Sequence, residues 1–158
     1  MKLYHGTVYD IKEIDLSKSN SAKDFGKGFY LSPDKSQAER WAIFKSIQLG
    51  GTPKVYEFEF DKSLLENKEL SVKQFDEYTK EWAEFIFANR KNLSEDNVHD
   101  YDVVIGPIAN DKVGVQIRNY MEGNISFEVF VERLKYMKGI TFQYFFGTEK
   151  AVKQLVKV

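Results

Sequence analysis

Two short segments near the N-terminus combine residue types that could bind a ligand and act on it. In YHGT, residues 4–7, a histidine precedes a glycine, so an imidazole stands beside a backbone N–H and C=O that no side chain shields. In DFGKGFYLS, residues 24–32, two glycines flank Lys27 and precede Tyr30. Each segment alone also has a simpler interpretation, a surface histidine and a turn before a core strand.

The glycines of the second segment do not match a known phosphate-binding or kinase motif. A Walker loop needs GxxxxGK[ST], and a Rossmann dinucleotide site needs GxGxxG; neither occurs in the chain. The DFG has no HRD before it and too little upstream chain for a kinase lobe. The segment therefore predicts a tight turn that leads residues 29–31 into a strand.

Composition excludes several kinds of chemistry. The chain has no cysteine, which excludes disulfides and a thiol nucleophile, and with two histidines and no HExxH we expect no metal site. Its 23 basic and 24 acidic residues leave no overall basic field of the kind that attracts nucleic acid. Thirteen Phe, nine Tyr and two Trp supply flat side chains for a core and for stacking on planar ligands.

Apolar periodicity with glycine and proline stops predicts a single domain over residues 1–158. The expected strands cover residues 2–6, 29–32, 55–60, 101–107 and 140–147. The expected helices begin at Ser32-Pro33, behind a capping box of Ser71 and Gln74, near Lys112, at Ser126 and at Thr148. Because strands and helices do not alternate steadily, we expect an α+β fold.

The N-terminus is too polar for a signal peptide, and no run of apolar residues is long enough to cross a membrane. We therefore expect a cytoplasmic protein with no membrane partner.

Taken together, His5-Gly6-Thr7, the GKGFYLS segment and a helix that carries Trp41 resemble the NAD-binding core of the ADP-ribosyltransferases. The likeness is to the diphtheria-toxin and poly(ADP-ribose) polymerase branch, with its histidine–tyrosine–glutamate triad. It implies a split β-sheet core with flanking helices, and NAD as the substrate. It also implies that His5 bonds a ribose hydroxyl and that the backbone of Gly6, within the motif completed by Thr7, pairs with the nicotinamide amide.

The same resemblance implies a stacked nicotinamide ring. Tyr30 would stack on one face and Trp41, eleven residues later, on the other, although Trp41 could equally be a core residue of its helix. Gly28 belongs to the segment that would contact NAD. Lys27 either neutralises the pyrophosphate or lies on a turn.

The chain is also similar to a small bacterial family assigned to the same superfamily, over nearly its whole length. The matching segments are YHG at 4–6, DFGKGFY at 24–30, QAERWA at 37–42, YDVVIGPIAND at 101–111 and QYFFGTEKAVKQL at 143–155. This similarity implies a bacterial toxin or effector, with a cognate antitoxin or another small regulatory protein as a partner.

One position departs from the toxin pattern. Where the triad has a glutamate on a late strand, the best-fitting residue is Gln143. A carboxylate there would hold the ribose 2′-hydroxyl and stabilise an oxocarbenium-like transition state, whereas glutamine accepts the hydrogen bond without supplying charge. Asp111 is the best substitute acid, with a helix N-cap as its other interpretation.

These residues support three hypotheses. The first is an NAD-dependent mono-ADP-ribosyltransferase that transfers ADP-ribose to a macromolecule or to water. The second is a catalytically weak or inactive module of the same fold that binds NAD or ADP-ribose. The third, transfer of an RNA 2′-phosphate to NAD, is disfavoured because no cluster of basic residues is visible in the sequence.

Overall fold

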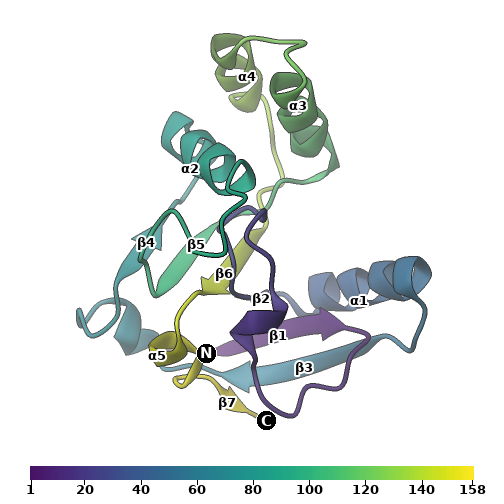
Figure 1. The fold of residues 1–158 in the computed structure, drawn as a ribbon, viewed down its shortest axis with the longest axis vertical. Helices are drawn as coiled ribbons and strands as arrows, with labels where there is room; N and C mark the ends of the chain where they lie inside the picture. The colour runs from purple at the N-terminus through teal and green to yellow at the C-terminus, as the bar shows by residue number, and fades with distance from the viewer.

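Strands from distant parts of the chain form two sheets in the computed structural model, which describes residues 1–158. A three-stranded sheet has the order β1-β3-β7, and a four-stranded sheet has the order β2-β6-β5-β4 (Figure 1). The strands are β1 Lys2–Thr7, β2 Phe29–Leu31, β3 Lys54–Glu59, β4 Val72–Gln74, β5 Val103–Pro107, β6 Phe142–Phe146 and β7 Val156–Lys157. The expectation of an α+β fold is confirmed.

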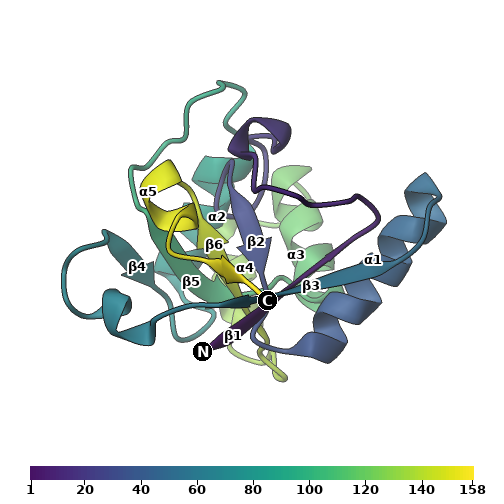
Figure 2. The ribbon, with the colours of Figure 1, turned by 90° about the horizontal axis from the view of Figure 1, so that it is seen from below.

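Five α-helices and two short 3₁₀ helices complete the chain. The α-helices are α1 Lys35–Leu49, α2 Lys80–Arg90, α3 Asp111–Met121, α4 Phe127–Leu134 and α5 Glu149–Val152, and the 3₁₀ helices are Leu16–Lys18 and Lys62–Leu65. Both views place α1 beside β1 and β3, with the two termini close together at one end of the molecule (Figures 1 and 2). None of these helices is long and apolar enough to cross a membrane.

Alternation along the strands of the four-stranded sheet separates two apolar cores. On one face Val103, Ile105 and Phe146 pack with residues of β1 and β3. On the other face Val104 and Phe145 pack with residues of α2, α3 and α4. Successive side chains of a strand point to opposite faces, so residues of β6 two apart share a face of the sheet. This places Gln143 on the same face as Phe145.

The two sheets meet at a single bridge between β1 and the residue that follows β2. Tyr4 and Ser32 exchange two backbone hydrogen bonds of 2.8 Å each. Beyond that bridge β1 pairs with β3, while β2 pairs with β6. Beyond Tyr4 the strands β1 and β2 therefore pair with different neighbours, and we call the seam where the two sheets separate the split.

Two predicted helix starts were wrong. The Ser71–Gln74 segment forms β4 instead of a capping box, because the carbonyl of Ser71 accepts from Asp102 and Val103 and this draws the segment alongside β5. The helix behind it is α2, capped by Thr79. Ser32 pairs with β1, so α1 is capped by Asp34. The helix expected near Lys112 is α3, which begins at Asp111 and is capped by Asn110.

Candidate functional site

The polar backbone groups of Gly6 point into the split. The N–H and C=O of Tyr4 both bond to Ser32, and these groups alternate sides along a strand. The N–H and C=O of Gly6, two residues later, therefore face the β2 side rather than β3. The carbonyl accepts a hydrogen bond of 3.4 Å from Nζ of Lys45 on α1. Gly6 is buried and Lys45 covers its carbonyl, so a molecule in the split would reach this carbonyl only after Lys45 moves.

His5 crosses the split to the main chain of Tyr30. Its Nδ1 lies 2.7 Å from the carbonyl oxygen of Tyr30, which can only accept, so Nδ1 carries the proton and Nε2 is left as an acceptor. The imidazole stacks on the ring of Phe29 with centroids 4.2 Å apart. Burial lowers the pKa of His5 to about 4, and the nearby charges of Lys45 and Lys23 act in the same direction. The imidazole is therefore neutral at physiological pH.

The phenol of Tyr30 is held by its own loop. Its hydroxyl donates to the carbonyl of Gly26 at 2.6 Å and accepts from the N–H of Phe25 at 3.0 Å. Its ring packs edge-on against Phe145, with centroids 5.2 Å apart. Burial raises the pKa of Tyr30 well above its ordinary value. Tyr30 is therefore suited to present a ring surface and unsuited to transfer protons near neutral pH.

The glycines of the GKG segment serve packing. A Cβ on Gly28 would lie 2.2 Å from the ring of Phe145, and Gly26 has a φ of +95° with the side chain of Asn97 close beside it. The same Asn97 brackets the peptide of Lys27, accepting from its N–H at 2.7 Å and donating to its carbonyl at 2.9 Å. The segment is a clamped turn, as the sequence indicated, and its amides do not converge on a phosphate site.

Two further contacts fix this turn, and no sequence pattern indicated them. Asp24 pairs with Arg90 at the end of α2, at 2.7 Å from Nε and 2.6 Å from Nη2. The carbonyl of Phe25, whose ring is fully buried, lies 2.7 Å from Nε2 of His99. These partners stand 66 and 74 residues further along the chain, so only the folded structure reveals the pairing.

Trp41 lies on α1 with half of its surface exposed, so it is not a core residue. Its ring stacks on Phe44 at 5.5 Å, and Nζ of Lys45 lies 5.5 Å from its centroid. Lys45 links Trp41 to the split because the same ammonium reaches the carbonyl of Gly6. Helix α1 packs closely here, since a Cβ on Gly6 would lie 2.0 Å from the carbonyl oxygen of Ala38.

Gln143 shares a sheet face with Tyr30. The β2–β6 register pairs Tyr30 with Phe145, and Gln143 lies two residues before Phe145 on the same face. The amide nitrogen of Gln143 is buried and has no hydrogen-bond partner. A buried amide donor without a partner is costly, and a ligand or a water molecule would satisfy it.

Asp111 makes no contact with the other expected site residues. It is exposed in the first turn of α3, and its carboxylate forms no hydrogen bond or ion pair with His5, Tyr30 or Gln143. Nor is it the helix cap, since that role belongs to Asn110. Thr7 is buried, and its hydroxyl accepts from the N–H of Tyr9 at 3.2 Å, which stabilises the turn after β1.

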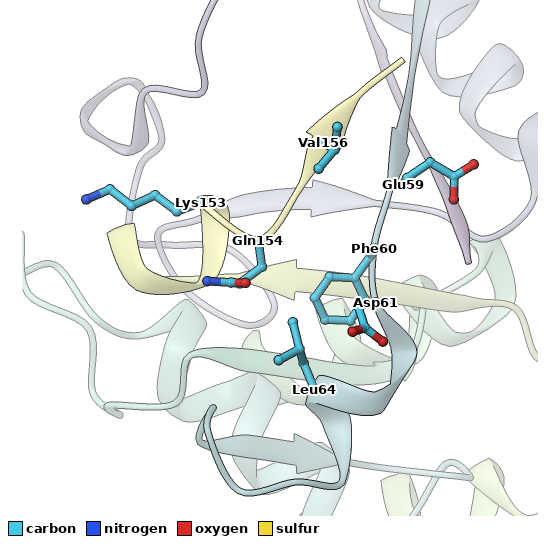
Figure 3. Close-up of a pocket in the computed structure, with 7 residues that line it drawn as sticks. All are labelled: Glu59, Phe60, Asp61, Leu64, Lys153, Gln154 and Val156. Atoms are coloured by element: carbon cyan, nitrogen blue, oxygen red, sulfur yellow. The ribbon is translucent and has the colours of Figure 1, made fainter.

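A surface hollow of about 460 Å³ lies at a different place, between the end of β3 and the C-terminal segment (Figure 3). Its lining residues are Glu59, Phe60, Asp61, Leu64, Lys153, Gln154 and Val156. It is shallow and includes none of the site residues expected from the sequence. No group of three His, Asp or Glu side chains lies close enough to hold a metal ion.

A family model described as "Protein of unknown function (DUF3990)" matches residues 1–156, so the chain belongs to this family. No curated protein and no solved structure shows significant similarity to the chain.

Proposed function

We propose that this member of the DUF3990 family is an NAD-dependent mono-ADP-ribosyltransferase with its site in the split between β1 and β2. The observation that carries the proposal is the hydrogen bond from His5 to the main chain of Tyr30, beside the peptide of Gly6, whose carbonyl accepts from Lys45. Residues that the resemblance to ADP-ribosyltransferases assigned to NAD binding thus meet at one place, although they stand 25 residues apart.

Each of these residues has a role that its geometry supports. Gly6 would pair with the nicotinamide carboxamide, since its N–H and C=O complement an amide. Tyr30 would stack on the nicotinamide ring, because its phenol is tied down and its ring is held rigidly. His5 would accept a hydrogen bond from a ribose hydroxyl at Nε2, because its fixed tautomer leaves that nitrogen unprotonated. Trp41 would border the bound molecule from α1.

The reaction breaks the bond between nicotinamide and ribose, and a nucleophile on a macromolecule, or water, forms the new bond to the same ribose carbon. The nucleophile's proton leaves to solvent or to a base on the acceptor. Gln143 is a better partner than Asp111 for the 2′-hydroxyl, because its amide nitrogen is buried and unpartnered, lies on the Tyr30 face and can donate to the hydroxyl oxygen. The resemblance further suggests a toxin or effector restrained by a small antitoxin-like protein.

A specific observation favours a second function, a module that binds NAD or ADP-ribose without cleaving it. Gln143 is neutral, and the partly buried carboxylate of Asp24 is already paired with Arg90. A missing charge at an oxocarbenium-like transition state typically costs about 3 kcal/mol of barrier, or roughly a hundredfold in rate. The neutral site would then bind NAD and turn it over slowly or not at all.

Incubation with labelled NAD, with and without cell lysate, separates the two functions. Wild type should release nicotinamide or transfer label, and Tyr30→Ala should lose this while Tyr30→Phe, which keeps the ring, retains most of it. Asp111→Asn is the matched control on an exposed residue and should match wild type. Thermal stabilisation by NAD without turnover supports the binding module. Failure of NAD either to bind or to react refutes both functions.

A further inference from the structure

Two lysine ammonium groups lie at the split without a carboxylate partner. Nζ of Lys23 lies 5.5 Å from the centroid of the Tyr30 ring, and Nζ of Lys45 lies 5.5 Å from that of Trp41 and 3.4 Å from the carbonyl of Gly6. Neither lysine belongs to an ion pair, although Lys2, Lys54, Lys80 and Lys135 do. These two cations are instead held by aromatic faces and one backbone carbonyl.

The surroundings of both ammonium groups favour the arrival of negative charge. Burial lowers the pKa of Lys23 and of Lys45, and the charge of Lys23 lowers that of Lys45 further. Both lysines also lower the pKa of His5, so the three groups lie within electrostatic reach of one another. Two cations that repel each other and have no carboxylate partner are stabilised by an anion placed between them.

We propose that Lys23 and Lys45 form an anion-binding pair that holds the pyrophosphate of a dinucleotide in the split. The assignment rests on the proposed NAD-binding function and names the residues that bind the charged part of the ligand. Lys27, the basic residue considered for this role from the sequence, does not share the position. The charge of Lys27 lowers the pKa of Asp15, on the loop before β2, and Lys27 is not among the groups that change the pKa of His5.

A phosphate group fits this pair better than the contacts the lysines now make. A hydrogen bond of 3.4 Å to a carbonyl and cation–π contacts at 5.5 Å are weaker than bonds from an ammonium to a phosphate oxygen. Exchanging these contacts for phosphate also uncovers the Tyr30 ring and the Gly6 carbonyl. The same movement of the lysines therefore opens the two groups that the proposed function assigns to nicotinamide.

The test uses inorganic pyrophosphate as the probe in isothermal titration calorimetry. We expect binding to wild type that weakens about tenfold to a hundredfold in the Lys23→Gln/Lys45→Gln double variant, as loss of charge-assisted hydrogen bonds predicts. Lys27→Gln is the matched control and should bind as wild type does. A Lys23→Arg/Lys45→Arg variant keeps both charges and should retain binding, which guards against a folding defect.

Each outcome bears on the proposal. It is overturned when pyrophosphate does not bind wild type, when the double variant binds as tightly as wild type, or when Lys27→Gln weakens binding equally. A parallel titration with NAD tells this failure apart from failure of the proposed function. Pyrophosphate binding that depends on the lysines, with no NAD binding, supports the anion pair and refutes the NAD site. NAD binding that is unchanged in the double variant supports the NAD site and refutes the anion pair.

Discussion

Acid should destabilise this fold through His5. The pKa of His5 falls from 6.5 to about 4 in the folded protein, chiefly through burial. Between these two values the unfolded chain binds a proton that the folded chain does not, so the stability is complete above the unfolded pKa and is lost as pH falls toward the folded pKa. The whole pKa shift would contribute roughly 3 kcal/mol to the free energy of unfolding. Because the imidazole is partly exposed, we expect a contribution of about 2 kcal/mol.

The assay is urea unfolding of wild type and His5→Asn at about pH 7 and about pH 4.5. Asparagine does not titrate, and its amide can donate to the Tyr30 carbonyl in place of Nδ1. Carboxylates whose pKa is lowered, such as Asp15 and Asp34, weaken both proteins alike on acidification. His99, whose pKa is also lowered by burial, is common to both as well.

Wild type should therefore lose about 2 kcal/mol more of its free energy of unfolding than His5→Asn over this pH interval. The reasoning is refuted when the two proteins lose the same amount. That result would mean that the imidazole is protonated as readily in the fold as in the unfolded chain, and it would remove the argument for a neutral His5 with a bare Nε2.

Two further predictions concern the turn before β2. Gly28→Ala should destabilise the protein by about 1–3 kcal/mol, because the new Cβ would lie 2.2 Å from the ring of Phe145. Gly114→Ala, in open space on α3, should instead stabilise it by about 0.5–1 kcal/mol. Thermal denaturation measures both variants, and equal shifts of the melting temperature would contradict the packing role of Gly28. Asp24→Asn should lower the free energy of unfolding by about 1–2 kcal/mol, because it breaks the ion pair with Arg90. A double-mutant cycle with Arg90→Met that gives no coupling energy would show that the pair does not stabilise the fold.

Local patterns predicted the strands of the site correctly. Alternation in VYEFEF and TFQYFF and the Gly-Pro stop after Ile105 predicted β3, β6 and β5, and these strands place Gln143 beside the Tyr30 strand. Periodicity could do this for β3 and β6 because their apolar residues recur at every second position, whereas β5 is buried at every position and was marked by its continuous apolar run and the Gly-Pro stop.

Long-range pairing accounts for what the sequence could not show. Ser71 has a good capping-box pattern, yet β5 recruits its segment as a parallel strand. The charge of the split was also hidden, because Lys23 and Lys45 stand on a loop and a helix and are brought together only in the fold. The sequence directed attention to Lys27, which lies inside the motif itself but changes the pKa of Asp15 and not that of His5.

A crystal structure of the protein with NAD would show directly whether NAD binds in the split with its nicotinamide on Tyr30. We expect the nicotinamide ring to stack on Tyr30, its carboxamide to pair with the backbone of Gly6, and the pyrophosphate to lie against Lys23 and Lys45. NAD bound in the hollow lined by Phe60 and Lys153, or crystals that exclude NAD at saturating concentration, would contradict this expectation.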